Sequence, residues 1–334
     1  MRAMFWESLP DGDVQCHLCE HSCKIKKGNK GKCSVRVNIG GSLQSLVSNV
    51  VTSGQVDPIE KKPLYHFFPG VKTFSIGSAG CNFRCSFCQN HRISCVPENG
   101  VIPGRRATPD ALIGLVEQNH NRIVAFTYNE PTVFFEQIYE ASGLAKARNM
   151  KVVLVSNGFM SDGFLQSLYK RVDAINVDLK AFSEKFYRER CGGRLKPVLK
   201  NLKTIKSMGW WLEVTTLVIP GCNDSESELR DLAAFIYQEL GPDTPWHITA
   251  FHGAYKMIDH PSTPSEQLEK IWSYGRESGL NYVYVGNIPC NVGSHTFCPT
   301  CSAMVIERNG YHIKYTGPIG QCPSCQVVLP GVWR

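Results

Sequence analysis

Residues 73–90 read TFSIGSAGCNFRCSFCQN, and this stretch decides how the rest of the chain is interpreted. Its first four residues predict a short strand, and the loop after them carries Cys81, Cys85 and Cys88. Three thiolates at these intervals suit a cubane iron–sulfur cluster, which normally takes four ligands, so one iron stays open for chemistry. Three core thiols or a partial zinc site are the alternative interpretation.

A regular alternation of short strands and helices begins at this stretch and continues towards the carboxyl terminus. Segments of helical length and period, such as 132–148 and 225–240, separate most of the strand-sized runs. Thr108-Pro109 and Thr263-Pro264 each place a capping residue before a proline, which predicts a helix start. This alternation predicts an α/β fold with a parallel sheet, either doubly wound or a full or partial (β/α) barrel. The runs predicted as strands are 73–76, 123–127, 152–156, 174–178, 212–218, 247–251 and 282–285.

The composition is that of an ordinary folded protein. The chain has 334 residues, of which 43% are hydrophobic and 19% charged, and these values exclude wholesale disorder and a coiled coil. No apolar stretch approaches the roughly 18–20 residues that span a membrane, and the amino terminus lacks the apolar core of a secretion signal. We therefore expect a soluble, cytoplasmic protein without a membrane partner. In that compartment, the fifteen cysteines are more readily metal ligands than disulfides.

The formal net charge is +7, and two segments concentrate it. Residues 21–36 hold six Lys or Arg and no acid, and residues 180–206 hold nine against two acids. Such segments are typical of solvated faces, and an acidic partner or nucleic acid is the alternative. The charged residues 60–62, Glu-Lys-Lys, are interpreted either as a solvated turn or as a contact for substrate or partner.

The cysteine loop resembles the signature of the radical S-adenosylmethionine superfamily, Cys-x3-Cys-x-aromatic-Cys after the first strand. The resemblance implies a partial (β/α)6 barrel and a [4Fe-4S] cluster on Cys81, Cys85 and Cys88, with S-adenosylmethionine (SAM) chelated to the open iron. It also implies one-electron cleavage of SAM to a 5′-deoxyadenosyl radical that abstracts hydrogen, in a site where the protein positions the cofactor and excludes water.

The same resemblance implies which side chains contact SAM, because the family places them at successive strand ends. Glu130 matches the carboxylate of a Gly-Gly-Glu-Pro-type motif that holds the methionine ammonium, whereas Asn129 stands where the family has a glycine. The candidate SAM-binding residues are Phe87, Asn129, Glu130, Ser156, Asn157, Asp178, Lys180, Val218 and His247. Taken singly, each of these is also an ordinary turn, cap or core residue.

A closer resemblance covers nearly the whole chain. Residues 57–67 (DPIEKKPLYHF), 88–90 (CQN) and 176–180 (NVDLK), with the terminal Cys-Pro-x-Cys, resemble the radical enzyme of the AmmeMemoRadiSam system, which is similar to pyruvate formate-lyase activating enzymes. This implies Memo-like and AMMECR-like partner proteins and a flavodoxin or ferredoxin as reductant. Activation of a glycyl-radical enzyme is the alternative reaction.

Four cysteines near the carboxyl terminus, Cys298, Cys301, Cys322 and Cys325, form two knuckles that can close a tetrahedral site. A closed four-thiolate site has no vacancy for chemistry, so zinc is the first choice and a single rubredoxin-like iron the second. Its predicted role is to fold the carboxyl-terminal end of the chain.

Four further cysteines near the amino terminus, Cys16, Cys19, Cys23 and Cys33, are less diagnostic, because their spacing does not match the bacterial ferredoxin run. Zinc, an auxiliary iron–sulfur cluster and thiols without metal all remain open. The remaining cysteines, Cys95, Cys191, Cys222 and Cys290, are predicted to be small buried hydrophobes.

The chain is accordingly divided into a Cys-rich metal-binding segment (1–40), a lead-in (41–72), the (β/α) array (73–290) and a zinc-ribbon or rubredoxin-like module (291–334). Two functions compete for this arrangement. The first is a radical SAM enzyme, and the second is a non-catalytic scaffold that binds nucleic acid or protein through the zinc-stabilised and basic segments.

Overall fold

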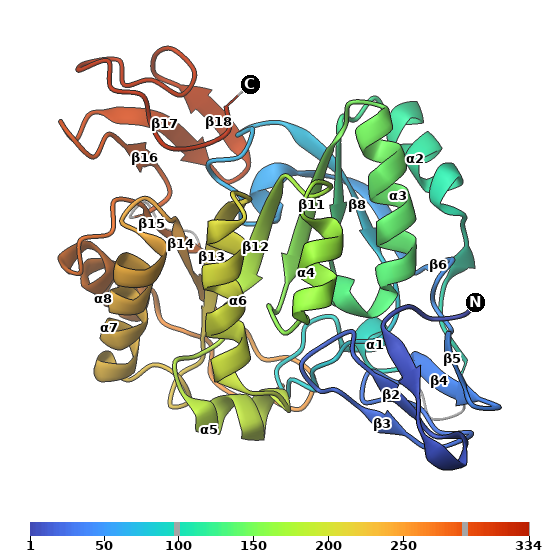
Figure 1. The fold of residues 1–334 in the computed structure, drawn as a ribbon. Coiled ribbons are helices and arrows are strands. Elements are labelled where there is room, and N and C mark those ends of the chain that lie inside the picture. Colours follow the sequence, from blue (N-terminus) through green and yellow to red (C-terminus); the bar gives the residue numbers. More distant parts are fainter. Residues whose placement is uncertain (97–100, 289–292, 334) are drawn as a thin grey trace.

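The computed structural model describes residues 1–96, 101–288 and 293–333 and is organised around one eight-stranded sheet (Figure 1). The strand order is β15-β14-β13-β12-β11-β10-β8-β7. All neighbours pair in parallel except β7 (Ser53–Pro58), which pairs antiparallel with β8 at the edge. The parallel strands confirm the seven predicted runs. They are β8 (Lys72–Gly77), β10 (Ile123–Phe126), β11 (Lys151–Ser156), β12 (Ala174–Asp178), β13 (Trp211–Val218), β14 (Trp246–Ala250) and β15 (Val283–Gly286).

Helices connect consecutive strands and cover one face of the sheet, so the predicted α/β class with a partial (β/α) barrel is confirmed (Figure 1). No helix among the described residues is long and apolar enough to cross a membrane. The main helices are α2 (Pro109–Gln118), α3 (Phe135–Ala147), α4 (Asp162–Leu168), α6 (Leu195–Ser207), α7 (Glu226–Phe235) and α8 (Ser265–Glu277). Shorter turns are η2 (Ile59–Lys61), α1 (His91–Ser94), η3 (Pro131–Phe134), α5 (Glu184–Phe186), η4 (Tyr187–Cys191) and η5 (Ile236–Leu240).

The two predicted helix caps have different outcomes. Thr108 caps α2, because its hydroxyl accepts a hydrogen bond from the Ala111 N–H. Thr263 does not cap α8, whose N-cap is Pro264, so that prediction was wrong. The Thr263 hydroxyl instead donates to the Val218 carbonyl (2.7 Å) and accepts from the Phe251 N–H (2.9 Å). It thereby joins the ends of β13 and β14.

Both faces of the sheet are covered, as is usual for parallel strands. Side chains alternate along each strand, so one set packs against the helices in the main core and the other set faces away. The second set, which includes Ala125 and Val153, packs against Ile59, Leu64 and Phe67 from the segment after β7. The lead-in segment therefore fills the side of the sheet that the helices leave open.

Residues 57–62 are part of this filling rather than a solvated turn. Lys62 is 1% exposed, and its Nζ lies 2.6 Å from Asp57 Oδ2. Glu60 is also buried and accepts a hydrogen bond from the Gly70 N–H (2.7 Å). Only Lys61 of the three is exposed, so the solvated turn was wrong for Glu60 and Lys62, and the contact with substrate or partner stays a prediction.

Two small modules flank the sheet at opposite ends (Figure 1). The amino-terminal one packs near the carboxyl ends of the strands, where the Ser161 N–H donates to the Leu18 carbonyl. The carboxyl-terminal one packs near their amino ends, where the Val332 N–H donates to the His66 carbonyl (2.7 Å). The first contains β1 (Trp6–Ser8), η1 (Pro10–Gly12), β2 (Val14–Cys16), β3 (Lys24–Ile25), β4 (Arg36–Ile39) and β5 (Ser42–Ser45), followed by β6 (Val50–Val51), which pairs with β9 (Arg105–Arg106). The second contains β16 (Thr296–Phe297), β17 (Met304–Asn309) and β18 (His312–Tyr315).

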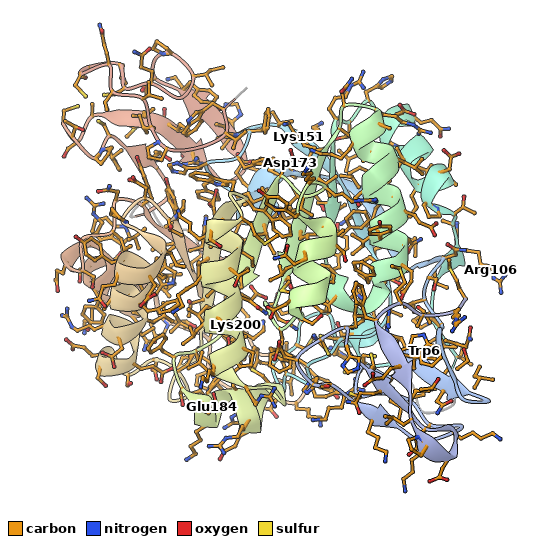
Figure 2. All side chains as sticks on the ribbon, in the orientation of Figure 1. Trp6, Arg106, Lys151, Asp173, Glu184 and Lys200 are labelled. Carbon is orange, nitrogen blue, oxygen red and sulfur yellow. The ribbon has the colours of Figure 1, made fainter. Side chains whose placement is uncertain are left out.

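The amino edge of the parallel strands is closed by ion pairs. Lys151 at the start of β11 and Lys146 at the end of α3 both bind the Asp173 carboxylate, which also accepts a hydrogen bond from the Val152 N–H. Figure 2 shows Lys151 and Asp173 together at the end of the sheet remote from Trp6. In parallel α/β folds this edge serves stability, and the carboxyl edge carries the active site.

Candidate active site

The three cysteines of the motif lie in the loop between β8 and α1, at the carboxyl edge of the parallel strands. The loop folds back on itself, because the Gly80 N–H donates to the Ile93 carbonyl (2.9 Å). Gly80 has φ of +85°, and a Cβ there would lie 2.6 Å from Val35 Cγ1 and 3.0 Å from the Cys33 carbonyl oxygen. A glycine is therefore required for the loop to lie directly against the amino-terminal module.

The sulfur atoms of Cys81, Cys85 and Cys88 interact through their charges without converging on one point. Within the described residues, the only set of three or more potential ligand atoms within 4.8 Å of one another lies elsewhere, in the carboxyl-terminal module. Burial raises the pKa of Cys81 and Cys88, and the neighbouring thiolates raise it further. A bound cationic centre larger than one ion would fill this spacing and stabilise the thiolates.

Lys180 supplies positive charge beside the cysteine loop. It follows β12, and its Nζ lies 2.9 Å from Asp178 Oδ2. Burial opposes the charged form of Lys180, but Asp178, Cys85 and Cys191 outweigh it and raise the pKa well above that of a free lysine. Lys180 therefore stays protonated and offsets negative charge at Cys85. Both residues predicted at the fourth strand end thus lie near the cysteine loop.

Cys191 is a site residue that the sequence analysis missed. It is buried, and a hydrogen bond from its thiol is the main cause that lowers the pKa of Cys85. The Cys191 carbonyl also accepts a hydrogen bond from the Arg84 N–H (2.7 Å) in the cysteine loop. Its predicted burial is confirmed, but no local pattern connects it with a loop so far away in the sequence. Of the other unassigned cysteines, Cys95 and Cys222 are partly buried, and Cys290 lies outside the described residues.

Glu130 holds the ends of β10 and β11 together. Its Oε1 accepts hydrogen bonds from the Thr132 N–H (3.0 Å), the Thr132 hydroxyl (2.6 Å) and the Ser156 hydroxyl (2.8 Å). Its Oε2 accepts from the Asn157 N–H (2.8 Å). Burial raises the pKa of Glu130, and these donors oppose that shift. Glu130 therefore positions Ser156 and Asn157, and its contact with SAM stays a prediction.

Two asparagines fix the cysteine loop to the neighbouring strand ends. Asn129 accepts a hydrogen bond from the Ser78 N–H (3.0 Å) and donates to the Gly80 carbonyl (2.9 Å). Asn157 donates to Asn82 Oδ1 (2.7 Å), and its Nδ2 lies 3.8 Å from Cys81 Sγ. The side-chain amide of Asn129 thus makes two hydrogen bonds to the cysteine loop that a glycine at this position could not make. Both residues lie at the loop, as expected of SAM-site neighbours.

Phe87 and Val218 are buried, which limits the parts of them that a ligand can reach. The Phe87 ring packs against Phe186 with the ring centroids 5.7 Å apart, and Lys180 Nζ lies 5.9 Å from the centroid of the Phe87 ring. Val218 ends β13, and its carbonyl accepts the Thr263 hydroxyl. Phe87 therefore contacts side chains at the cysteine loop, whereas Val218 is a candidate only because it lies at the carboxyl end of a strand.

His247 belongs to a different cluster. It is the second residue of β14, and its Nε2 lies 2.6 Å from Glu213 Oε2. The rings of Tyr65 and Tyr284 enclose it, with centroids 4.7 and 5.3 Å away. Glu213 also accepts the Tyr65 N–H, so the pair anchors the lead-in segment. These contacts place His247 among structural residues and not beside the cysteine loop.

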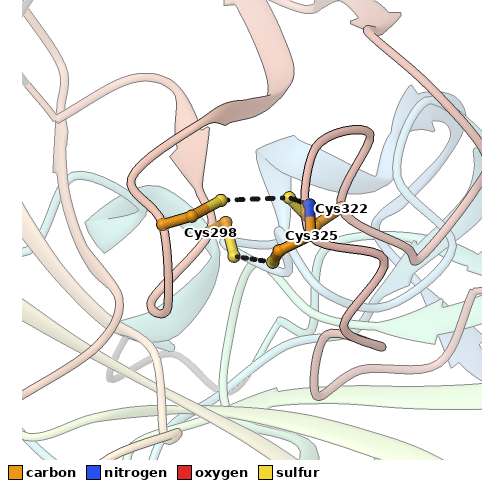
Figure 3. A group of neighbouring side chains, drawn as sticks. Cys298, Cys322 and Cys325 are labelled. Atoms are coloured by element: carbon orange, nitrogen blue, oxygen red, sulfur yellow. Dashed lines mark hydrogen bonds between the residues drawn. The ribbon is translucent and has the colours of Figure 1, made fainter.

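The four carboxyl-terminal cysteines, Cys298, Cys301, Cys322 and Cys325, do converge (Figure 3). Their sulfurs all lie within 4.8 Å of one another, with pairs at 3.5 Å between Cys298 and Cys325 and between Cys301 and Cys322. The backbone N–H groups of Cys325 and Ser324 lower the pKa of Cys322 to about 6. The geometry suits one tetrahedral ion with thiolate ligands.

The four amino-terminal cysteines gather around a cavity at the opposite end of the molecule. Cys16 and Cys33 are buried, and Cys19 and Cys23 are partly buried. Burial raises the pKa of Cys19, Cys23 and Cys33. The set is thus brought together, but more loosely than the carboxyl-terminal one.

The parallel α/β sheet thus presents three potential thiolate ligands for a metal cluster at its carboxyl edge, where enzymes of this fold class carry their active sites. Residues 75–236 match the profile of the Radical SAM superfamily. The chain is 40% identical over 325 residues to the uncharacterized protein MJ0808 of Methanocaldococcus jannaschii, covering 97% of this chain and 96% of that one. The chain therefore belongs to the radical SAM superfamily and is an enzyme of that chemistry.

Two further comparisons fit this assignment. The chain is 21% identical over 241 residues to the pyruvate formate-lyase-activating enzyme of Clostridium pasteurianum, covering 67% of this chain and 98% of that enzyme. SuiB of Streptococcus suis, solved with S-adenosylmethionine bound, matches the fold with a TM-score of 0.52 at 13% identity. That match covers 70% of this chain and 53% of SuiB, so the chain spans about half the length of that neighbour.

The superfamily implies a [4Fe-4S] cluster and SAM, and the residues present fit them. Among the described residues, the three soft sulfur donors do not all lie within the 4.8 Å that would suit a single ion, and the cation of Lys180 lies beside them. The strand ends next to the loop present buried polar groups on Glu130 and Asn157. These groups have the character needed to bind the charged methionine end of SAM.

Proposed function

We propose that this radical SAM enzyme uses Cys81, Cys85 and Cys88 to bind three irons of a [4Fe-4S] cluster, and that SAM occupies the fourth. The observation that carries the proposal is the set of three widely spaced thiols at the carboxyl edge, with Lys180 and Asn157 next to them. When bound, the cluster supplies one electron that cleaves the sulfonium of SAM to methionine and a 5′-deoxyadenosyl radical for hydrogen abstraction.

The chain's own residues bind, orient and shield the cofactors. Asn129 and Asn157 hold the cysteine loop against the strand ends, so that the three thiols keep their spacing. Glu130 fixes the Ser156–Asn157 turn, and its Oε2 retains a lone pair for the ammonium of SAM. Lys180 stabilises thiolate charge at Cys85.

The remaining candidate contacts complete the SAM site. Phe87 closes the loop side, Asp178 lies beside Lys180, and Val218 lies at the end of β13, where the adenine is expected. His247 is not part of this site: it binds Glu213, which anchors the lead-in segment, and its variants should alter stability and not SAM binding. Together with Cys298, Cys301, Cys322 and Cys325 as a zinc site, the residues of the SAM site make up the proposed functional set.

The substrate is proposed to be presented by a partner. The pyruvate formate-lyase-activating relative is named for acting on another enzyme, which supports hydrogen abstraction from a protein-borne group, including activation of a glycyl-radical enzyme. The resemblance to the AmmeMemoRadiSam system adds Memo-like and AMMECR-like proteins as partners, and a flavodoxin or ferredoxin as the reductant. A cytoplasmic location is consistent with these partners.

The test is 5′-deoxyadenosine formation by anaerobically reconstituted protein with dithionite and SAM, measured by liquid chromatography. The parent is expected to form it, and Cys88→Ala is expected to fall to the rate measured without protein. Cys95→Ser is the matched control, because Cys95 belongs to no cysteine set, and it should behave like the parent. If the parent forms no 5′-deoxyadenosine, or Cys88→Ala matches it, the scaffold interpretation replaces the enzyme.

A further inference from the structure

We propose that Cys16, Cys19, Cys23 and Cys33 bind a second [4Fe-4S] cluster and not a zinc ion. The proposal concerns the metal in the amino-terminal module, and it stands whatever substrate the enzyme acts on. Three observations carry it, namely the spacing of the sulfurs, the cavity between them, and a buried arginine beside them.

The spacing argues against a single ion. A tetrahedral zinc site with Zn–S bonds of about 2.3 Å places its sulfurs about 3.8 Å apart. The carboxyl-terminal set has this geometry, whereas in the described residues no three of the amino-terminal sulfurs lie within 4.8 Å of one another. In this respect they match Cys81, Cys85 and Cys88, the ligands of the central cluster. A cubane holds its ligating sulfurs apart, because four irons and four sulfides stand between them.

The space between the sulfurs is also larger than one ion leaves. All four cysteines line a cavity of about 20 Å³. About 10–15 Å³ is enough to hold a water molecule, so the sulfurs do not close on a point. Leu18, Ile25 and Val133 contribute apolar walls. Such walls exclude water, which is one of the levers that set the potential of an iron–sulfur cluster.

A buried arginine marks the cavity as a site for an anionic centre. Arg36 is 1% exposed and lines the cavity, with its Nη1 3.9 Å from Cys16 Sγ. Its other side is ion-paired with the buried Glu136. Arg36 Nε has no hydrogen-bond partner among the described residues. A thiolate or sulfide of a bound metal centre would supply a stronger acceptor for that group than a neutral thiol does.

The position of the module gives a second cluster a role that zinc lacks. His21 Nε2 lies 2.7 Å from the Asn82 carbonyl oxygen, and Arg84 Nη2 donates to the Lys32 carbonyl (2.8 Å), so residues on both sides of the set touch the central cysteine loop. Zinc has no redox chemistry. A [4Fe-4S] centre here accepts one electron from a low-potential carrier and passes it to the central cluster. The carrier is oxidised by one electron, and no bond or proton changes.

The deciding experiment removes the central cluster and counts what remains. In the triple variant Cys81→Ala, Cys85→Ala, Cys88→Ala, reconstituted anaerobically, we expect about four irons and four sulfides per chain, with about one zinc in the carboxyl-terminal module. Electron paramagnetic resonance of the reduced variant should show a [4Fe-4S]⁺ signal that SAM does not alter. Adding Cys16→Ser and Cys19→Ser should abolish that signal, whereas adding Cys95→Ser should not.

Two results would overturn the proposal: about two zinc ions and no iron in the triple variant, or iron that survives loss of Cys16 and Cys19. If the triple variant does not fold, as judged by circular dichroism, the parent is compared with its Cys16→Ser, Cys19→Ser variant: a loss of about four irons per chain supports the proposal, and equal iron refutes it. Failure of the proposed function is a separate outcome. It would leave the Cys16→Ser, Cys19→Ser variant without a signal that responds to SAM.

Discussion

The two terminal sets of four cysteines differ in where they lie and in how closely their sulfurs approach. The carboxyl-terminal set closes to pairs at 3.5 Å and packs on Tyr282 and Tyr284, away from the cysteine loop. The amino-terminal set stays open around a cavity, and its backbone touches the loop that carries Cys81. Equal ligand counts thus accompany two different geometries.

The difference follows from the chain between the ligands. The carboxyl-terminal set consists of two Cys-x2-Cys knuckles, and in the second the N–H groups of Ser324 and Cys325 point towards Cys322 Sγ. Two such knuckles can close around one ion. The amino-terminal set has only one such pair, Cys16 and Cys19; Cys23 and Cys33 follow after three and nine further residues, and Arg36 is buried among them. Position and spacing therefore support the two proposed roles, folding for the carboxyl-terminal set and electron transfer for the amino-terminal set.

The largest expected effect separates the two sets by function. Cys16→Ser with Cys19→Ser should slow 5′-deoxyadenosine formation driven by a flavodoxin or ferredoxin by about tenfold or more, because the central cluster loses its nearest redox neighbour. Cys301→Ser, which changes the same atom in the other set, should leave the rate per folded molecule unchanged. The measurement is the initial rate with a protein reductant. Equal rates for the two variants would show that the amino-terminal set has no special role in electron transfer.

The second effect separates the sets by stability. Cys301→Ser should lose the zinc of the carboxyl-terminal module and lower the Tm, by about 2–4 °C for each kcal/mol lost in a protein of this size. Limited proteolysis should then cut within residues 293–333 before the barrel is attacked. Calorimetry and zinc analysis check both expectations. A Tm and a digestion pattern equal to those of the parent would show that this set does not fold the module.

The sequence predicted the sheet and the cysteine loop because both depend on local pattern. Apolar runs gave all seven parallel strands, and the intervals between Cys81, Cys85 and Cys88 gave the proposed cluster ligands. The contact between Cys191 and Cys85 could not be predicted, because only the fold brings the two residues together. Thr263 was assigned to a cap because its competing partners, Val218 and Phe251, come from other strands.

Residues with two local interpretations needed tertiary contacts to decide between them. Lys62 is charged and therefore resembles a surface residue, but Asp57 and the ring of Tyr128 give it a buried partner and a wall. His247 lies on a strand of the (β/α) array, but its side chain binds Glu213 and does not contact the cysteine loop. In each case a residue distant in the sequence, Tyr128 for Lys62 and Glu213 for His247, decides the environment of the side chain.

A third prediction sharpens the contrast between the two edges of the sheet. Lys180→Met removes a partly buried cation beside Cys85 and should lower the reduction potential of the central cluster by roughly 60 mV, a tenfold change in the one-electron equilibrium. Lys151→Met, at the amino edge, is the matched control and should leave the potential unchanged. Redox titration followed by electron paramagnetic resonance measures both. Equal potentials in the two variants would mean that Lys180 does not face the cluster.

The smallest expected effect concerns the surface through which the electron enters. Lys24, Lys26, Lys27, Lys30 and Lys32 are exposed around the amino-terminal cysteines. Because flavodoxins and ferredoxins are usually acidic, Lys27→Glu should slow reduction by such a carrier about two- to threefold at low salt, and the difference should vanish at high salt. Lys314→Glu, in the other module, changes the same charge on a side chain that is 70% exposed and should have no effect. Stopped-flow kinetics of reduction measure both variants. A slower reaction with Lys314→Glu would place the carrier's docking site, and the entry point of the electron, on the carboxyl-terminal module.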